Sequence, residues 1–358
     1  MSSAIWPERP VRVRAPATSA NLGPGFDALS LALALYDDVE ARVTDGELVI
    51  EVSGEGSDTA AAGEQHLVVR AMRAAFGAMG GQPPGIALRC ANAIPHGRGL
   101  GSSAAAICSG LLAARALAGP GDAPLSDEAV FQLAARLEGH PDNVAACLAG
   151  GLTIAWTPGP DPAGARLLRI GVPATLRAVA CVPPAPMATE AARQALPRTV
   201  PHADAAANAA RSALLVAALT GAPDTLFDAT EDFLHQPYRA AIMPEAASLL
   251  GALRRAGAAA VVSGAGPAVL VLSFDGRRPS AEAVDSIARE TGIAWHVIPL
   301  HIDQQGAHVQ QGGLDVYPPV GARHAPTRDQ GPSGTGRGPG ADRTGGPGHD
   351  RASFLRDR

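Results

Sequence analysis

Apolar and polar positions along the 358-residue chain follow two spacings, one typical of strands and one typical of helices. Alternation, or a short apolar run between turn residues, predicts strands at 11–14, 28–36, 47–52, 85–90, 152–156, 177–182, 258–262, 268–274 and 293–299. Apolar residues three and four positions apart predict helices at 66–79, 103–118, 126–139, 143–148, 204–219, 225–235, 244–256 and 281–290. Because the two kinds of element do not alternate in a strict βαβ rhythm, the pattern favours an α+β fold over a doubly wound sheet.

Serine, proline and glycine residues predict where several of the helices begin and end. Ser102 and Ser126 are predicted N-caps, because a serine hydroxyl can accept a hydrogen bond from the first turn of a helix. Pro244 is expected to open a helix, and Gly119 with the following proline is expected to end one. The strand at 11–14 is expected at the edge of its sheet.

Two stretches interrupt the pattern. Residues 157–162 are rich in proline and glycine, and they predict a seam between two domains at 8–160 and 161–311. Residues 312–358 are rich in Gly, Pro, Arg and Asp and almost free of apolar residues. Such a segment cannot offset the entropy lost on ordering, so we expect a disordered tail.

The composition indicates a soluble, cytosolic protein. Hydrophobic residues make up 46% of the chain, which suffices for a sizeable core, and neither a signal peptide nor a membrane span is expected. The net charge of −5 predicts no nucleic acid or membrane partner. The four cysteines, scattered without a C-x-x-C pair, are expected to be buried free thiols: Cys90, Cys108, Cys147 and Cys181. The oligomeric state stays open, and a homodimer is compatible with the sequence.

The chain contains no lysine, and this absence excludes several functions. P-loop NTPases and protein kinases hold nucleotide phosphates with a lysine. Schiff-base chemistry and attachment of pyridoxal phosphate also need one. If this protein handles ATP, it must use main-chain amides, hydroxyls, carboxylate-held magnesium and arginine.

A loop with three glycines precedes the alanine-rich helix predicted at 103–118. Glycines let the backbone fold closely around an anion, and a helix N-terminus offers free N–H groups and the positive end of a dipole. The loop therefore predicts a phosphate-binding site, although some such loops are only tight connections. Its residues are Pro95, His96, Gly97, Arg98, Gly99, Leu100, Gly101, Ser102, Ser103, Ala104 and Ala105.

Four further segments are too polar and too constrained to be ordinary connections, namely 17–27, 137–143, 235–239 and 263–267. The glycine loop resembles the P-x-x-x-G-L-G-S-S-A signature of the GHMP family of small-molecule kinases, and 263–267 resembles that family's C-terminal glycine turn. The other three segments resemble the branch of the family that phosphorylates L-homoserine. The resemblance covers about residues 8–310, with the five segments in the family's order.

The resemblance implies a fold and two cofactors. It implies an N-terminal ribosomal S5 domain 2-like ATP-binding domain and a C-terminal ferredoxin-like α+β domain. It also implies ATP, with its phosphates on the amides of residues 99–103, and Mg²⁺, with Ser103 and Glu138 as ligands. Mg²⁺ prefers hard oxygen ligands and keeps several waters, so one hydroxyl and one carboxylate suffice. Asp142 is the alternative carboxylate.

The implied substrate is L-homoserine, which presents an ammonium, a carboxylate and the hydroxyl to be phosphorylated. The resemblance assigns Asp27 to the ammonium. By residue type, Asn21 and His140 could donate or accept hydrogen bonds around the hydroxyl and backbone polar groups. A substrate carboxylate favours arginine, whose planar fork binds it through two hydrogen bonds. Arg239, in H-Q-P-Y-R, matches the family position, and Arg193 is the candidate for a second arginine.

The site is predicted to work without a strong base. Several relatives carry an aspartate where this chain has Asn143, and an amide can hold a hydroxyl but cannot remove its proton. Phosphoryl transfer through a loose transition state needs little deprotonation of the nucleophile. We therefore expect direct in-line attack, with Asn143, Glu138, Ser103 and His140 as the catalytic group. His140 as a general base is the alternative.

Two rival functions are compatible with part of the pattern. Another GHMP kinase would act on mevalonate or a sugar, but those substrates offer no ammonium for Asp27. A relative that only binds ligand would be expected to have lost the glycine loop, Ser103 or Glu138, and all of them are present.

Overall fold

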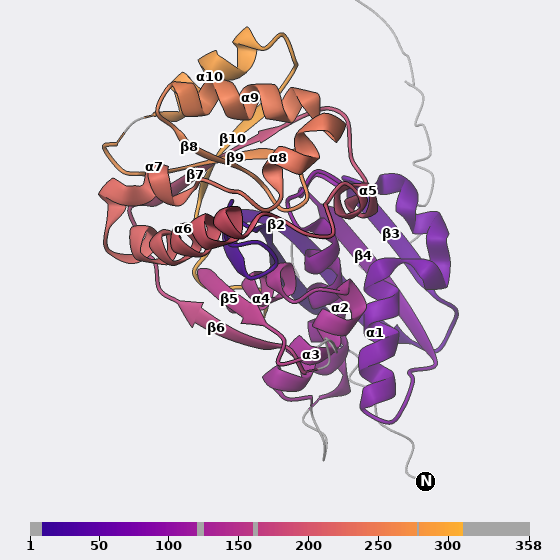
Figure 1. The fold of residues 1–358 in the computed structure, drawn as a ribbon. Coiled ribbons are helices and arrows are strands. Elements are labelled where there is room, and N and C mark those ends of the chain that lie inside the picture. The colour runs from indigo at the N-terminus through magenta and orange to yellow at the C-terminus, as the bar shows by residue number, and fades with distance from the viewer. Residues whose placement is uncertain (1–8, 120–124, 160–163, 278, 311–358) are drawn as a thin grey trace, which may run out of the picture. The chain divides into compact units, whose positions relative to one another are not determined.

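The strands form two separate sheets in the computed structural model, which describes residues 9–119, 125–159, 164–277 and 279–310 (Figure 1). The strands of the first sheet are β1 (Val11–Ala20), β2 (Leu29–Thr44), β3 (Val49–Gly54), β4 (Gly85–Asn92), β5 (Leu152–Trp156), β6 (Arg166–Ile170) and β11 (His308–Val309). The strands of the second sheet are β7 (Leu176–Val182), β8 (Ala259–Val262), β9 (Val269–Phe274) and β10 (His296–His301). The predicted α+β class is confirmed.

Ten helices lie in the described part of the chain. They are α1 (Leu67–Ala78), α2 (Ser102–Ala118), α3 (Asp127–Glu138), α4 (Asp142–Ala149), α5 (Thr189–Gln194), α6 (His202–Thr220), α7 (Leu226–Ala229), α8 (Gln236–Arg239), α9 (Pro244–Arg255) and α10 (Ala281–Glu290). Short 3₁₀ turns occupy Ser57–Gln65, Pro223–Thr225 and Ala240–Ile242. Two helix starts are confirmed, since the Ser126 hydroxyl accepts from the N–H of Ala129 at 3.1 Å and Pro244 is the first residue of α9.

Helix α2 packs on the first sheet, among the helices that cover it. The sheet runs β11-β1-β2-β4-β3, with β5 on β2 and β6 on β5, and β3–β4 is the parallel pair. Most of the α2 side chains are buried, between α1, α3, α4 and strands β1 and β2 (Figure 1). A Cβ on Gly110 would lie 2.5 Å from the carbonyl oxygen of Val68, so the glycine lets α1 approach closely. This packing fixes the N-terminus of α2.

The second sheet has the ferredoxin-like arrangement that the resemblance implied. Its order is β10-β7-β9-β8, and every neighbouring pair is antiparallel. Helices α9 and α10 precede β8 and β10 along the chain, which gives a βαββαβ sequence of elements with additional helices before α9. Apolar residues of α9, α10 and the sheet, among them Leu249, Leu253 and Val284, form its core.

The predicted helix at 225–235 is wrong over most of its length. Only α7 is α-helical there, and the following turn is held by the Asp232 carboxylate. That carboxylate accepts hydrogen bonds from the N–H groups of Leu234, His235 and Gln236. An aspartate that satisfies nearby N–H groups competes with the helix, and here the turn is the result.

Two other predictions need correction. Strand β1 is not an edge strand, because β11 pairs with it on the side opposite β2, through Val13 with Val309. Ser102 is the first residue of α2, and its N-cap is Gly101 with a left-handed φ of 71°. Strand β6, helix α5 and the two-residue β11 carried too little apolar periodicity to be predicted.

The boundaries proposed from composition are not tested by the fold. The predicted tail at 312–358 lies outside the described residues, as does part of the seam at 157–162. Strand β6 still belongs to the first sheet, so the chain leaves that sheet between Ile170 and Leu176. The division into domains at 160 and 161 stays a prediction.

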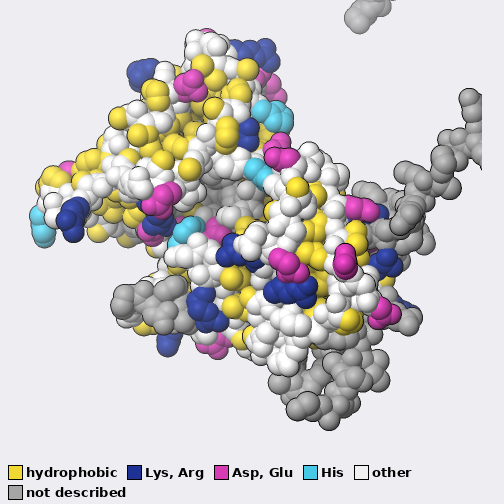
Figure 2. Space-filling view, turned by 90° about the vertical axis from the view of Figure 1, so that its right-hand side faces the viewer, with side chains coloured by type: hydrophobic (Ala, Val, Ile, Leu, Met, Phe, Trp, Pro, Cys, Tyr) yellow, Lys and Arg dark blue, Asp and Glu magenta, His cyan; other side chains and the backbone are white. Residues whose placement is uncertain are grey.

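The surface of the described residues carries charges of both signs (Figure 2), and the cysteines lie in the interior. On the face shown in Figure 2, arginine and acidic side chains of the described residues are interspersed. The four cysteines are free and buried, as predicted. Among the described residues, no helix combines the length and apolar character that crossing a bilayer requires.

Candidate active site

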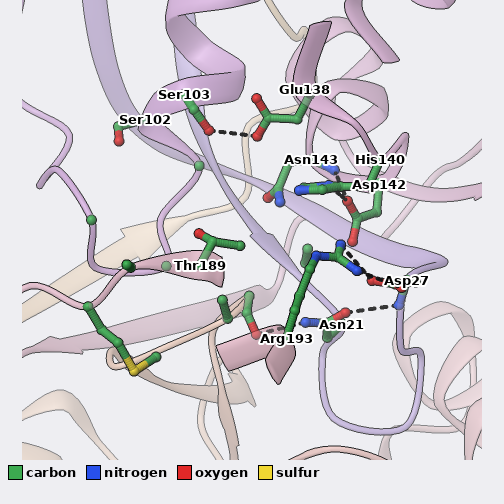
Figure 3. A pocket seen from close by; sticks show the side chains of 18 of the residues that line it. Asn21, Asp27, Ser102, Ser103, Glu138, His140, Asp142, Asn143, Thr189 and Arg193 are labelled. Carbon is green, nitrogen blue, oxygen red and sulfur yellow. Dashed lines mark hydrogen bonds and ion pairs between the residues drawn. The ribbon is translucent and has the colours of Figure 1, made fainter. Parts of the chain in front are cut away.

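Residues from all five predicted segments line one cavity of about 240 Å³ (Figure 3). It lies where the loop after β1, the N-termini of α2 and α4, helix α5 and the turn before β9 meet. The cavity is lined by Ala20, Asn21, Asp27, Gly97, Gly99, Gly101, Ser102, Ser103, Glu138, His140, Asp142, Asn143, Met187, Ala188, Thr189, Arg193, Arg239, Gly264 and Ala265. The structure therefore brings together every predicted metal-binding and substrate-binding residue.

The glycine loop is locked against the second glycine turn. Gly97, Gly99 and Gly101 have left-handed φ angles of 65°, 79° and 71°. A Cβ on Gly99 would lie 2.2 Å from the carbonyl oxygen of Ser263, whose hydroxyl donates to the Gly99 carbonyl at 2.6 Å. Only glycine fits this approach, and the loop leads directly into the N–H groups of the first turn of α2. The arrangement suits an anion.

Not every residue of the predicted loop lines the cavity. Leu100, Ala104 and Ala105 are fully buried in the core, and Pro95 is buried as well. Arg98 donates to the carbonyls of Pro183, Pro184 and His96, so it fastens the loop to the segment after β7. His96 lies in the neighbouring cavity described below.

Ser103 and Glu138 face each other across one end of the cavity. The Ser103 hydroxyl donates to the Glu138 carboxylate at 2.6 Å (Figure 3). Burial at the C-terminal end of α3 raises the pKa of Glu138, although the charge of His140 and the bond from Ser103 oppose the shift. Among the described residues, no cluster of three or more His, Cys, Asp or Glu side chains is placed to hold a metal. A hydroxyl beside one carboxylate does fit Mg²⁺ that shares its other ligands with phosphates and water.

Asp142 organises the start of α4. Its carboxylate accepts from the Asn143 N–H at 2.8 Å and lies 2.7 Å from Nδ1 of His140. Burial disfavours the charged imidazole of His140, but the hydrogen bond and charge of Asp142 outweigh it and raise the pKa of His140. Asp142 is 1% exposed and is occupied by these two partners, so it is less suited than Glu138 to hold a metal.

The loop after β1 holds an unusual backbone. Asn21, Leu22 and Asp27 have φ angles of 68°, 48° and 53°, and they are the non-glycine residues with positive φ in the described part of the chain. Such residues cost about 1–3 kcal/mol each and persist only where the surroundings hold them. The Asn21 amide does so, since it donates to the Gly264 carbonyl at 2.7 Å and accepts from the Asp27 N–H at 2.9 Å.

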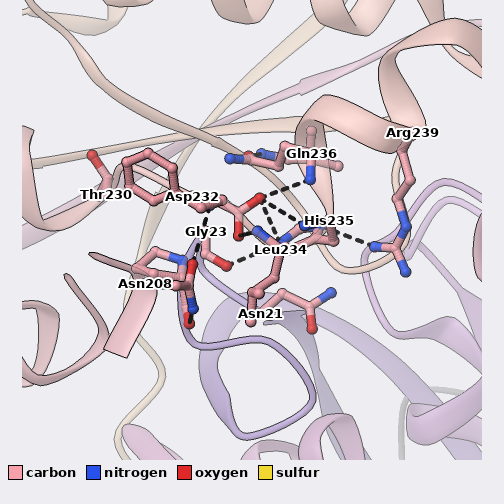
Figure 4. A network of polar contacts seen from close by, with 12 residues as sticks. Asn21, Gly23, Asn208, Thr230, Asp232, Leu234, His235, Gln236 and Arg239 are labelled. Carbon is pink, nitrogen blue, oxygen red and sulfur yellow. Dashed lines mark hydrogen bonds and ion pairs between the residues drawn. The ribbon is translucent and has the colours of Figure 1, made fainter. Parts of the chain in front are cut away.

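A buried polar network around His235 and Asn208 also holds the loop after β1 (Figure 4). His235, fully buried, lies with Nε2 2.9 Å from the Gly23 carbonyl and with Nδ1 3.1 Å from Nη1 of Arg239. Because a carbonyl only accepts, Nε2 carries the proton and Nδ1 accepts from Arg239. Burial also lowers the pKa of His235, which agrees with a neutral ring. The Asn208 amide adds a bond to the Pro24 carbonyl at 2.8 Å.

Arg239 and Arg193, the two predicted carboxylate-binding arginines, differ in burial and in partners. Arg239 is 2% exposed, and its Nε donates to the Ala192 carbonyl on α5 at 3.0 Å. Arg193, also on α5, is more exposed and pairs with the Asp27 carboxylate through two contacts of 3.4 Å. The predicted partners of a substrate ammonium and a substrate carboxylate, Asp27 and Arg193, therefore lie in direct contact in the cavity (Figure 3).

A second cavity, which the sequence did not indicate, adjoins the first. Ser102 and Ser103 line both. In the second, the ring nitrogen Nδ1 of His66 and the hydroxyl of Ser109 are buried without a hydrogen-bond partner among the described residues. Buried polar atoms without partners are rare and point to a ligand or water. Asp37 and His96 line the same cavity. His96 belongs to the predicted glycine loop, but Asp37, His66 and Ser109 are scattered in the sequence and no motif marks them.

Asp37 gives a stability prediction. Burial raises the pKa of Asp37 to about 6, although its carboxylate accepts from the N–H groups of Ala93 and Ile94. A pKa raised on folding stabilises the folded state at low pH, and this contribution is lost as pH rises through about 6. We expect Asp37→Asn, which can still accept both bonds, to raise the free energy of unfolding by about 1–3 kcal/mol at pH 8 and not at pH 4. Denaturant unfolding at both pH values measures this.

Asp38 supplies the matched control. Its carboxylate is paired with Arg12 and Arg14, whose hydrogen bonds and charges outweigh the effect of burial and lower the pKa of Asp38. Asp38→Asn is therefore expected to lower the free energy of unfolding at pH 8. If Asp37→Asn changed the free energy of unfolding equally at pH 4 and at pH 8, burial would not disfavour the charge of Asp37.

Comparison with known proteins gives a consistent result. The family model for the GHMP kinases N terminal domain matches residues 66–151, and that for GHMP kinases C terminal matches residues 212–294. A homoserine kinase of Streptomyces coelicolor is 54% identical over 299 residues, which cover 84% of this chain and 94% of the relative. A homoserine kinase of Clavibacter michiganensis is 48% identical over 312 residues, covering 87% and 97%.

Solved structures agree with these relatives. The crystal structure of a homoserine kinase from Cytophaga hutchinsonii superposes with a TM-score of 0.69 at 27% identity, covering 84% of this chain and 97% of that one. A mevalonate kinase superposes with a TM-score of 0.61 at 12% identity, which shows a common fold.

Proposed function

Because this chain belongs to the homoserine kinases of the GHMP family, we propose that its first cavity transfers the γ-phosphoryl group of ATP to the hydroxyl of L-homoserine. The product is O-phospho-L-homoserine, and the reaction serves threonine biosynthesis. The observation that carries the assignment to this cavity is the pairing of Asp27 with Arg193 beside the glycine loop.

The cavity has the charges that an amino acid zwitterion needs. Asp27 can pair with the ammonium, and Arg193 and Arg239 can bind the carboxylate. In the free protein, Arg193 and Asp27 neutralise each other at 3.4 Å. A zwitterion placed between them gives each a new partner of opposite charge, so binding leaves neither unpaired. Mevalonate and sugars offer no ammonium for Asp27.

The two adjoining cavities suggest how ATP lies. The triphosphate would follow the N-terminus of α2, where the glycine loop and the N–H groups of the first turn can bind phosphate oxygens. Since Ser102 and Ser103 line both cavities, the nucleoside would occupy the second and the γ-phosphoryl group the first. His66 Nδ1 and the Ser109 hydroxyl then gain partners.

Ser103 and Glu138 are the residues that would hold Mg²⁺. Their oxygens lie 2.6 Å apart next to the helix start on which the triphosphate is placed. Bound there, the ion would neutralise charge on the phosphoryl oxygens during transfer. Arg193, Asn143 and the main-chain amides position the reacting groups, and positioning supplies most of the rate in such a reaction.

The transfer proceeds in line, without a strong base. The homoserine hydroxyl oxygen forms a bond to the γ-phosphorus while the bond from that phosphorus to the bridging oxygen of ADP breaks. The hydroxyl proton leaves late, to an oxygen of the transferred group or to water. Asn143 lines the cavity and holds the hydroxyl by its amide. General-base action by His140 remains the alternative. The homodimer, the cytosolic location and the absence of nucleic acid or membrane partners remain predictions.

A substrate comparison tests this function. In a coupled assay of ADP release, we expect turnover with L-homoserine and none with mevalonate or galactose. With 4-hydroxybutyrate, which lacks the ammonium, kcat/KM is expected to fall roughly 10- to 100-fold, because the charged hydrogen bond to Asp27 is lost. Turnover with mevalonate or galactose alone would contradict the assignment, and equal kcat/KM for 4-hydroxybutyrate would remove Asp27 from substrate binding.

A further inference from the structure

Thr18 lies directly behind Asn143 and does not line the cavity. It is fully buried in β1, and its hydroxyl donates to Oδ1 of Asn143 at 2.8 Å. Its backbone N–H donates to the Leu100 carbonyl in the glycine loop at 3.0 Å. A Cβ on Gly101 would lie 1.9 Å from the Thr18 hydroxyl oxygen, so that oxygen sits tightly beneath the loop. Thr18 thus connects the phosphate loop to Asn143.

In the structure, the hydrogen bond from Thr18 goes to the oxygen of the Asn143 amide and leaves the NH₂ group without that partner. A side-chain amide has one accepting oxygen and one donating NH₂ group. With Oδ1 bound to Thr18 behind it, Asn143 presents its NH₂ group to the cavity. The main chain of Asn143 is also fixed, since its N–H donates to Asp142 at 2.8 Å. The last torsion of asparagine is broad and roughly two-fold, so without Thr18 either half of the amide can face the cavity.

We propose that Thr18 is a positioning residue that keeps Asn143 in the donating orientation towards the homoserine hydroxyl; this rests on the proposed function. An NH₂ group that donates to the hydroxyl oxygen leaves one lone pair of that oxygen for attack and leaves its proton free to point elsewhere. An amide turned the other way would accept that proton in a hydrogen bond without being able to take it, and would hold the hydroxyl in a different orientation. Correct orientation of the nucleophile therefore depends on a hydroxyl that the substrate never contacts.

Three variants test the proposal. We expect Thr18→Val to lower kcat about 10- to 100-fold, with the KM values for ATP and homoserine within about threefold of the parent, because misplaced reacting groups lose turnover on that scale. Thr18→Ser keeps the hydroxyl and is expected to restore kcat to within about threefold. Thr44→Val is the matched control, since the Thr44 hydroxyl is buried without a partner among the described residues. Thermal unfolding of each variant shows whether it is folded.

Asn143→Ala separates this proposal from the proposed function. If Asn143→Ala keeps its turnover, the role given to Asn143 fails, and the proposal for Thr18 fails with it. If Asn143→Ala loses most turnover while Thr18→Val does not, only the proposal for Thr18 is overturned. The proposal for Thr18 is also overturned if Thr18→Ser lowers kcat as much as Thr18→Val does. It is overturned as well if Thr18→Val raises the KM for ATP and leaves kcat unchanged, which would place the effect in the glycine loop. In the double variant, Thr18→Val should cost no further activity beyond Asn143→Ala.

Discussion

Replacement of Glu138 by glutamine is expected to lower kcat on the order of 10³-fold without unfolding the protein. Glutamine has nearly the same shape and can keep a hydrogen bond with the Ser103 hydroxyl, which lies 2.6 Å from the carboxylate. It lacks the negative charge that would hold Mg²⁺ beside the triphosphate. ADP release measured across a range of Mg²⁺ concentrations should show both the lower kcat and a higher concentration for half-maximal rate.

Asp142→Asn is the control for this prediction, because it removes the other candidate carboxylate. Asp142 is engaged with His140 and with the Asn143 N–H, so its loss should act through those bonds. The Mg²⁺ concentration for half-maximal rate should then stay unchanged. If Asp142→Asn shifts that concentration and Glu138→Gln does not, the metal ligand is Asp142.

The predicted site residues could be chosen from the sequence because they lie in short segments with local geometry, and the structure places them around one cavity. Glycines at 97, 99 and 101 adopt the left-handed backbone that a tight phosphate loop needs, and Ser103 follows at a fixed distance in the first turn of α2. Likewise, a spacing of a few residues places Glu138 at the end of α3 and Asn143 at the start of α4. Such relations can be read from the sequence alone.

Contacts between distant segments could not be predicted in this way. Thr18 reaches Asn143 across 125 positions, and Asn21 reaches Gly264 across 243. No pattern in the sequence marks either pair. The turn at Asp232 shows the same limit locally, because apolar spacing predicted a helix where a carboxylate bound three N–H groups instead. Polar side chains that satisfy the backbone override apolar periodicity.

The strained loop after β1 shows how the two sheets cooperate in the site. Its backbone is held by Asn208 and His235 and by the Gly264 carbonyl, which belong to segments after α5. Since His235 also accepts from Arg239, one neutral imidazole fixes both the loop that carries Asp27 and the buried arginine. The groups assigned to the ammonium and to the carboxylate are thus positioned by a single network.

Gly99→Ala is expected to lower kcat/KM for ATP at least 100-fold, because a side chain here separates the two glycine segments. A Cβ would lie 2.2 Å from the Ser263 carbonyl oxygen and 2.9 Å from that of Gly266, so the main chain must move. A displacement of about 1 Å in positioning groups can cost 10²-fold in rate. Gly80→Ala is the matched control, since Gly80 has a φ of 88° but a Cβ there would meet nothing within 4 Å. Because alanine is strained at this φ, we expect Gly80→Ala to lower the free energy of unfolding by about 1–2 kcal/mol and to keep its activity. Equal kcat/KM for ATP in both folded variants would show that the loop does not bind the triphosphate.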